Sequence, residues 1–298
     1  MQSIAVNKHS AEQRLDRFLR KSFPAAPLGL FFAILRKRKV RVNGAVGKAA
    51  QIVRENDVVQ IYENLPMAEP EKFFGQKKTI DGIREKLNFA ELNSDFAIIN
   101  KPCGLASQSG SGISEEESLA GMLEIWAREE GLDFKPALAH RLDKETSGLL
   151  IAALSGAALR EFGTLLRGRK IKKEYLALVK GNMPQKSGKI SMALPGDNKV
   201  SVSSWKVEKR FEECDLVRVS LETGRKHQIR LHFAQIGHPL LGDSKYGDFS
   251  LNRKFKKELN LSRLFLHSAY LEFYWHGEEM IFEAELPSDL NLLYLTLL

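Results

Sequence analysis

The stretch HRLDKETSGLLIAAL, residues 140–154, joins a dense polar segment directly to an apolar one. Its first eight residues carry an imidazole, a guanidinium, an ammonium, two carboxylates and two hydroxyls, whereas residues 148–154 have the pattern of a buried strand. A turn that leads into a buried strand is a favourable place for function, because the strand holds the polar side chains in a fixed position. This segment is therefore the first candidate site, and the strand behind it is the first element of a core.

The carboxylates of this segment offer more than one interpretation. Asp143 is flanked by Arg141 and Lys144, and a carboxylate among cations remains ionised and can act as a nucleophile or a general base. Glu145 fits that description almost as well. Asp, Thr and Ser also cap many turns without any catalytic part. The residue types alone leave these alternatives open.

From residue 91 onward, strand patterns are mixed with helical ones. Helices are predicted at 115–131 and 156–169, and strands at 96–102, 148–154, 174–181, 199–211, 214–224, 264–275 and 280–286. The strands outnumber the helices and do not alternate strictly with them. We therefore predict an α+β domain with a mixed, mostly antiparallel sheet.

The composition suits a two-domain protein of ordinary globular character. The chain has 298 residues, of which 43% are hydrophobic, and no apolar run approaches the roughly 20 residues that span a bilayer. The first residues lack the apolar stretch of a signal peptide, so we expect a soluble, cytoplasmic protein with no membrane partner. Cys103 and Cys214 stand far apart, which predicts neither a disulfide nor a thiolate metal site. Without a coiled-coil pattern, we expect a monomer.

The positive charge is concentrated in the first fifth of the chain. The net charge is +8; residues 1–62 hold 12 Lys and Arg against 4 Asp and Glu, whereas the remainder holds 33 of each sign. Five of the cations follow one another closely: Arg36, Lys37, Arg38, Lys39 and Arg41. Such a row can neutralise several phosphates at once, which predicts a polyanion-binding module.

Two helices and a short β segment are predicted in that module. Helical spacing occurs at 12–23 and 28–39, a turn at Asn43-Gly44, and a strand at 57–62. The segments RLDRFL, ILRKRKVRVNG and VRENDVVQIY resemble an S4 domain, a small RNA-binding module, which implies that the basic row binds RNA. We predict an S4-like domain at 1–62, a linker at 63–90 with a short helix near 80–87, and a second domain at 91–298.

Two further stretches combine polar chemistry with regular structure. Residues 222–247 place Arg225, His227 and Arg230 before a helix, and an arginine can pair with a carboxylate through two hydrogen bonds. The histidines there do not have the spacing of metal ligands, so no metal is expected. Tyr175 follows three lysines at the start of a strand, where it could stack on a base or simply belong to the core.

Four segments in order are similar to the RluA family of pseudouridine synthases: NKPCGL, HRLDKETSGLL, KKEYLALVKG and TGRKHQIRLHFAQIGHPLLGDSKYG. They span residues 100–247, and RLFLHSAYLEF extends the resemblance toward the C-terminus. The resemblance implies an isomerase that converts uridine in RNA to pseudouridine without a cofactor. It also implies that Asp143, rather than Glu145, is the catalytic carboxylate, either as a nucleophile or as a base.

The resemblance assigns parts to other residues as well. It implies that Tyr175 stacks on the target base and can remove a sugar proton, and that Arg230 pairs with the catalytic carboxylate. Arg141 would hold the RNA open once the uridine is flipped. The remaining residues expected to bind the substrate are His140, Thr146, Arg225, His227 and Gln228.

The S4-like module, with its segment ILRKRKVRVNG, points to the family members that act on large-subunit RNA. We therefore expect 23S ribosomal RNA, or an assembly intermediate of the large subunit, as the partner. One alternative is a synthase for tRNA or another RNA. Another is a non-catalytic RNA-binding or ribosome-assembly factor on the same scaffold, against which the intact Asp143, Tyr175, Arg141 and Arg230 argue.

Overall fold

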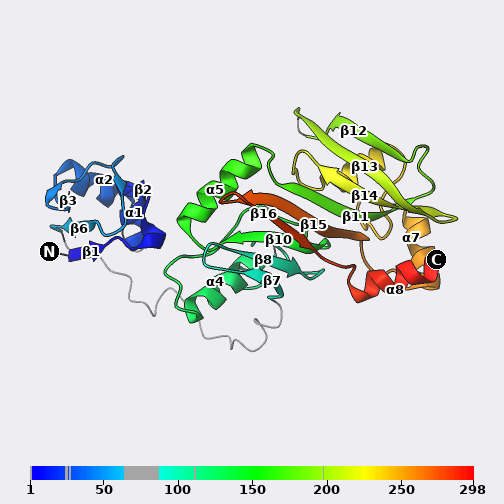
Figure 1. The fold of residues 1–298 in the computed structure, drawn as a ribbon, viewed down its shortest axis with the longest axis horizontal. Helices are drawn as coiled ribbons and strands as arrows, with labels where there is room; N and C mark the ends of the chain where they lie inside the picture. The colour runs from blue at the N-terminus through cyan, green and yellow to red at the C-terminus, as the bar shows by residue number, and fades with distance from the viewer. Residues whose placement is uncertain (1, 24–25, 27, 64–86, 111, 197) are drawn as a thin grey trace.

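The fold is described from a computed structural model, which covers residues 2–23, 26, 28–63, 87–110, 112–196 and 198–298. The N-terminal part forms a small domain around a four-stranded sheet with the strand order β1-β6-β3-β4 (Figure 1). Its elements are β1 (Gln2–Ala5), η1 (Lys8–Ser10), β2 (Gln13–Arg14), α1 (Leu15–Ser22), α2 (Leu28–Arg36), β3 (Val40–Val42), β4 (Ala45–Val46), β5 (Ile52–Val53) and β6 (Val58–Ile61).

Helix α1 is amphipathic and buries Leu15, Phe18 and Leu19 in the core of the small domain. It begins three residues later than the predicted helix at 12–23, because Gln13–Arg14 pair with β5 as a short strand. The predicted turn at Asn43-Gly44 joins β3 to β4. Both of its residues have positive φ, 51° and 82°, as a tight two-residue hairpin turn requires. The predicted order of two helices before the main hairpin is therefore confirmed, and β1 is an additional edge strand.

The second domain is built on one large sheet with the order β12-β13-β14-β11-β15-β10-β8-β7, to which β16 and β9 add through β15 and β10 (Figure 1). Among the described strands of this sheet, every pairing is antiparallel except that of β10 with β15. This confirms the predicted α+β class with a mixed, mostly antiparallel sheet. The strands are β7 (Phe89–Leu92), β8 (Phe96–Lys101), β9 (Ala137–Leu138), β10 (Ser147–Ala153), β11 (Lys172–Lys180), β12 (Ser187–Ala193), β13 (Val200–Arg210), β14 (Cys214–Leu221), β15 (Leu266–Trp275) and β16 (Glu278–Glu283).

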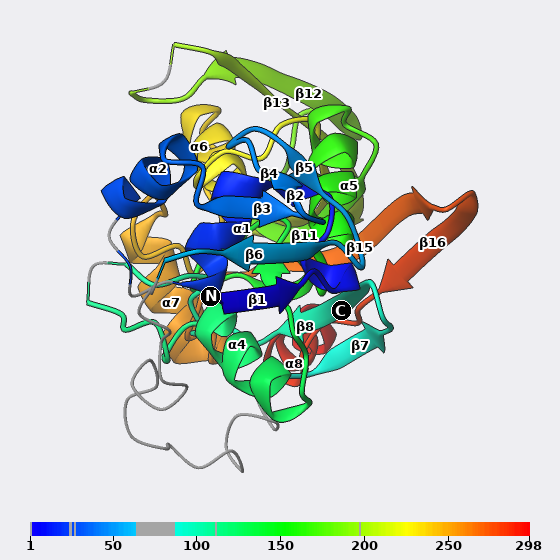
Figure 2. The same cartoon turned by 90° about the vertical axis from the view of Figure 1, so that its left-hand side faces the viewer.

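Helices cover both faces of the sheet and explain why β10 is apolar throughout rather than alternating. Leu150 and Ala152 of β10 belong to the same core as helix α4, whereas Leu149 and Ile151 pack in the core of helix α5 on the other face (Figures 1 and 2). The helices are α4 (Leu119–Glu129), α5 (Gly156–Arg167), α6 (Gln228–Gln235), α7 (Phe249–Leu259) and α8 (Ser288–Leu297). None of the helices in the described ranges is long and apolar enough to cross a membrane.

A close approach of two strands fixes the mouth of β10. Gly148 pairs with Ser268 of β15, and its φ is +107°. A Cβ atom at this position would lie 2.2 Å from the carbonyl oxygen of Ser268, so only glycine fits there. Ser268 also pairs with Tyr175 of β11. The contact therefore brings the polar loop before β10 close to the strand that carries Tyr175.

The interdomain segment begins the large sheet earlier than predicted. Strand β7 starts at Phe89 and pairs with β8, although the predicted linker extends to residue 90. The predicted short helix at 80–87 lies almost wholly outside the described residues.

Elements β12, α7 and α8 were not predicted. Helices α7 and α8 pack together on the face formed by β11 and β14. Helix α7 also carries local helix signals, because Asp248 caps its N-terminus and lysines stand in its last turn.

Candidate active site

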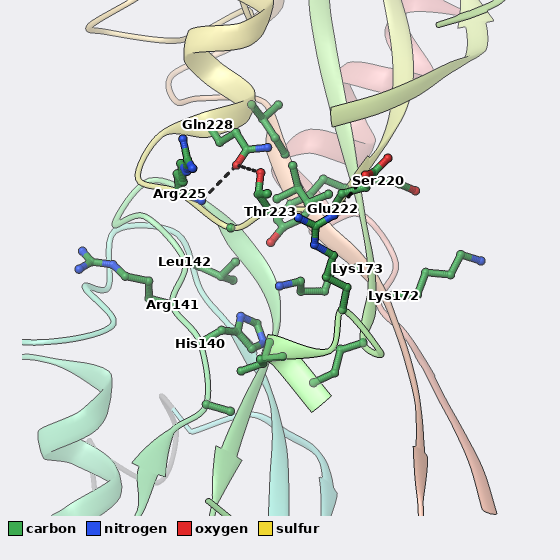
Figure 3. Close-up of a pocket in the computed structure, with 18 of the residues that line it drawn as sticks. His140, Arg141, Leu142, Lys172, Lys173, Ser220, Glu222, Thr223, Arg225 and Gln228 are labelled. Carbon is green, nitrogen blue, oxygen red and sulfur yellow. Dashed lines mark hydrogen bonds and ion pairs between the residues drawn. The ribbon is translucent and has the colours of Figure 1, made fainter. Parts of the chain in front are cut away.

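A cleft of 1140 Å³ brings together the three polar stretches of the sequence. Its walls come from the loop before β10, the first half of β11, the end of β14 and the loop that leads into α6 (Figure 3). Asp143, Tyr175 and Arg230, which are the predicted catalytic residues, all line it. Segments that lie 32 and 55 residues apart in the chain therefore meet in one place.

Asp143 lies between a guanidinium and an imidazole. Its carboxylate is 17% exposed, and Oδ2 lies 3.7 Å from Nη1 of Arg230. The other oxygen, Oδ1, lies 3.7 Å from Nε2 of His227. Burial and the nearby cations lower the pKa of His227, although the charge of Asp143 opposes this. The carboxylate is thus accessible from the cleft, and its permanent cationic neighbour is Arg230.

Arg230 has a stronger partner than Asp143. Its Nε and Nη2 atoms both donate 2.7 Å hydrogen bonds to Asp243, a carboxylate that is fully buried. Oδ1 of Asp243 also accepts the backbone N–H groups of Lys245 and Tyr246, each at 2.9 Å. Burial opposes the charge of Arg230, but these hydrogen bonds and the neighbouring carboxylates leave its pKa above the ordinary value. Asp243 therefore fixes the guanidinium in a charged state beside Asp143.

The sequence analysis did not single out Asp243 or Tyr246. Both stand in the quoted segment GDSKYG, but no spacing rule connects them with Arg230. The ring of Tyr246 lies 5.2 Å from the guanidinium carbon of Arg230, and its hydroxyl is 2.9 Å from Nδ1 of His227. His227 has a left-handed backbone, with φ of 55°, directly before α6. Tyr246 therefore supports both the guanidinium and the imidazole that lie next to Asp143.

Tyr175 is buried at 6% exposure and pairs with Ser268 across the sheet. Burial raises the pKa of its hydroxyl above the ordinary value, and the charge of Asp143 adds to this, whereas the Ser268 side chain opposes it. The phenol is neutral at physiological pH. Tyr175 lines the cleft and keeps its hydroxyl proton there.

A second loop holds the backbone on both sides of Asp143. The fully buried amine of Lys101 donates to the carbonyls of Pro102 and Leu105, at 2.9 and 2.8 Å, and lies 3.4 Å from that of Lys144. The hydroxyl of Ser107 donates to the carbonyl of residue 142 at 2.7 Å and accepts the N–H of that residue at 3.0 Å. Burial lowers the pKa of Lys101 to about 8. Residues 101–107 thus position the loop that carries Asp143.

Two residues expected to bind substrate already form hydrogen bonds with other groups of the protein. Nε2 of His140 accepts the N–H of Ile151 at 3.3 Å, and burial, with the nearby Lys173, lowers the pKa of His140 to about 3. Gln228 is 2% exposed; its oxygen accepts from Thr223 and its nitrogen donates to the β13 backbone. Both side chains line the cleft, but their polar atoms hold its walls in place.

The other expected substrate-binding residues differ in exposure. The hydroxyl of Thr146 lines the cleft, is buried, and has no hydrogen-bond partner in the described part of the chain. Arg225 and Arg141 also line the cleft, and the exposed Arg141 extends away from the other labelled side chains in Figure 3. Within the described ranges, no three His, Cys, Asp or Glu side chains gather as a metal site would require.

The basic row of the small domain runs from the end of α2 into β3. Arg36, Lys37 and Arg38 are exposed. Lys39 pairs with Glu63, and the guanidinium of Arg41 lies 5.5 Å from the centre of the Tyr62 ring. Four of the five predicted RNA-binding cations, including Arg41, are therefore exposed, whereas Lys39 is half-buried and paired.

Comparisons with known proteins show the family to which the chain belongs. The family model for RNA pseudouridylate synthases matches residues 95–235, and that for S4 domains matches residues 13–59. The ribosomal large subunit pseudouridine synthase C of Escherichia coli K12 is 32% identical over 97% of this chain and 93% of its own length. The protein of the same name from Yersinia pestis is 33% identical over 98% and 94%.

Solved structures show the same fold. The human RNA pseudouridylate synthase domain containing 1 protein has a TM-score of 0.55 at 25% identity and covers 72% of this chain and 87% of its own. The domain containing 4 protein has a TM-score of 0.61 at 23% identity, over 72% and 95%. The chain belongs to the RNA pseudouridylate synthase family. It is an RNA pseudouridine synthase with an N-terminal S4 domain, as the four motif segments predict.

Proposed function

We propose that this enzyme converts uridines in 23S ribosomal RNA, or in an assembly intermediate of the large subunit, to pseudouridine. The relatives named ribosomal large subunit pseudouridine synthase C, which align over nearly the whole chain, support this substrate. The exposed cations Arg36, Lys37 and Arg38 support it as well, because a large folded RNA offers many phosphates outside the reacting nucleotide.

Asp143 is the catalytic residue of this proposal, and the observation that carries it is its position beside Arg230 in the cleft. In the reaction the bond between the sugar and N1 of uracil breaks, the base turns, and C5 bonds to the sugar. Charge develops as the first bond breaks, and a preorganised carboxylate with a fixed cationic neighbour can stabilise it. Because Asp243 already satisfies Arg230, Asp143 remains able to approach the substrate.

The reacting atoms of a uridine are hidden in stacked RNA, so the nucleotide must leave the stack to reach Asp143. Tyr175 supplies a buried aromatic surface on which the extruded uracil can stack. Arg141 is exposed on the same loop as Asp143 and can fill the space that the uridine leaves. His140, Thr146, Arg225, His227 and Gln228 complete the substrate pocket in this proposal, with His140 and Gln228 acting through the walls that they hold.

The test is the release of tritium from a large-subunit rRNA transcript labelled at C5 of uridine, because bonding of C5 to the sugar frees that hydrogen. We expect release by the wild type and none by Asp143→Asn, with unchanged RNA binding. Glu145→Gln is the matched control, since Glu145 also lies near Arg230, at 3.8 Å, but is 40% exposed. Release by Asp143→Asn, or loss by Glu145→Gln alone, would contradict the assignment.

A tRNA transcript labelled in the same way separates the substrate classes. Release from tRNA and not from rRNA would refute the proposed target while retaining the chemistry. Binding without release from either RNA would favour a non-catalytic RNA-binding factor. The domains at 1–62 and 91–298, with the start of the second moved to Phe89 and the linker 63–90 shortened accordingly, belong to the same proposal, as do the monomeric state and the cytoplasmic location. The family matches at 13–59 and 95–235 fall inside the two domains.

A further inference from the structure

Two adjacent lysines at the start of β11 both line the cleft but differ in their partners. Lys172 lies 3.4 Å from Glu174 and 3.4 Å from Glu272, and its amine is 4.7 Å from the centre of the Tyr270 ring. Neighbouring side chains of a strand point to opposite faces, so Lys173 points the other way. Figure 3 shows Lys172 extending outward, whereas Lys173 lies toward His140 and Thr223.

Lys173 shares its face of β11 with Tyr175, which is two residues further along the strand. It lines the cleft, and a Cβ atom built on Gly224 would lie 3.7 Å from its amine. Its charge also reaches His140, which stays neutral at physiological pH. Lys173 therefore stands between the loop before β10 and the loop before α6.

No carboxylate in the described part of the chain forms an ion pair with Lys173. The amine is half-buried, and burial lowers its pKa. A cation removed from water without a counter-charge is costly, and an anion that enters the cleft offsets this cost. The contrast with the doubly paired Lys172 indicates that the partner of Lys173 comes from outside the chain.

The position along the strand indicates which anion this is. Two residues of an extended strand span about 6.8 Å. This is comparable to the separation between the base of a nucleotide and its own phosphate. If uracil stacks at Tyr175, a phosphate of the same nucleotide falls near the amine of Lys173.

We propose that Lys173 binds a phosphodiester oxygen of the nucleotide whose base enters the cleft beside Tyr175. This inference rests on the proposed function, because it requires a flipped nucleotide in the cleft. Lys173 then acts as a substrate-binding residue that holds the extruded nucleotide by its backbone. The S4 domain, in contrast, binds phosphates elsewhere on the RNA.

The first experiment compares Lys173→Gln with Lys172→Gln in the full-length enzyme, using the tritium assay on the large-subunit transcript. We expect Lys173→Gln to lower kcat/KM by about tenfold or more, mainly through KM, and Lys173→Arg to recover much of the loss. Lys172→Gln removes a lysine that lines the same cleft but is already paired with Glu174 and Glu272, and it should lower kcat/KM clearly less than Lys173→Gln does. Equal losses in the two glutamine variants would overturn the proposal, because they would indicate a general effect of surface charge.

The second experiment replaces the phosphate itself. A short RNA that contains the mapped target uridine is prepared with a neutral methylphosphonate on the 5′ or on the 3′ side of that uridine. One of the two methylphosphonates should lower kcat/KM of the wild type as much as Lys173→Gln does. The same methylphosphonate should lower kcat/KM of the Lys173→Gln variant little further. Additive losses at both positions would refute a direct contact.

The binding measurements separate failure of this inference from failure of the proposed function. If the wild type releases no tritium, the proposed function fails, but the dependence of transcript binding on salt still tests Lys173. Loss of one phosphate contact should lower the slope of log K against log salt by about 0.7. An unchanged slope in Lys173→Gln, in a variant that melts at the wild-type temperature, would reject the contact.

Discussion

The basic row of the S4 domain and the cations of the cleft present opposite solutions to binding RNA. Arg36, Lys37 and Arg38 are exposed, whereas Arg230 is 5% exposed and bonded twice to Asp243. Exposed charges are screened by salt and attract phosphates without fixing their geometry. A buried pair has a fixed geometry and is far less screened. We therefore expect the first region to contribute affinity and the second to place one nucleotide.

Removing the charge of Asp243 tests most strongly whether the cleft depends on a buried ion pair of fixed geometry. Asp243→Asn leaves the buried guanidinium of Arg230 without its main partner, and breaking a buried ion pair costs about 3–5 kcal/mol. We expect the free energy of unfolding, measured in urea, to fall by about that amount, and kcat to fall with it as Arg230 moves toward Asp143. Glu145→Gln removes the exposed carboxylate near the same arginine and should change stability by less than about 1 kcal/mol.

If the Asp243→Asn enzyme were as stable and as active as the wild type, the buried pair in the cleft would be no more important than the exposed cations of the S4 domain. Loss of stability with unchanged kcat would show that the pair holds the fold but does not position Arg230 for the reaction.

The second test uses the other buried cation, Lys101, whose pKa is lowered to about 8 by burial. Between pH 8 and 10.5 the native amine has lost its proton while the unfolded chain still holds one. Unfolding in this range takes up a proton, so a rise in pH opposes unfolding. The free energy of unfolding of the wild type therefore rises by up to about 3 kcal/mol relative to that of Lys101→Met.

The measurement is the difference in free energy of unfolding between wild type and Lys101→Met at several pH values. It should be constant below pH 8 and should grow above it. Lys144→Met removes an exposed lysine next to Asp143. Its free energy of unfolding should vary with pH in parallel with that of the wild type. Parallel curves for Lys101→Met as well would contradict the burial of a charged amine under the loop.

The smallest effect is expected where the cations are exposed. Replacing Arg36, Lys37 and Arg38 together with glutamine should reduce the slope of log K against log salt for transcript binding by about 2, at about 0.7 for each lost contact. The free energy of unfolding and kcat at saturating RNA should stay near the wild-type values. A lower kcat with an unchanged slope would reverse the assignment of affinity to the S4 domain.

Much of the fold follows from local patterns. The period of two predicted the strands at β13 and β14, and the helical period predicted α1, α2, α4 and α5, with errors of a few residues at their ends. Helix α7 was not predicted although Asp248 caps its N-terminus, whereas α8 has no side-chain cap and packs with α7 against the sheet. The four motif segments predicted the family, and with it Asp143, Tyr175 and Arg230 as the candidate catalytic residues. They did not predict what each side chain contacts.

The sequence by itself determined the composition of the site: a carboxylate, an aromatic residue and an arginine on segments that recur in one family. It also determined the separate basic module, since charge and period are local properties. Only the tertiary structure decided that Arg230 binds Asp243 more closely than Asp143. It also decided that Lys172 is paired, whereas Lys173 has no carboxylate partner among the described residues. Such contacts join residues from different strands and loops. They depend on the registers and close approaches, such as that of Gly148 to Ser268, which only the assembled sheet sets.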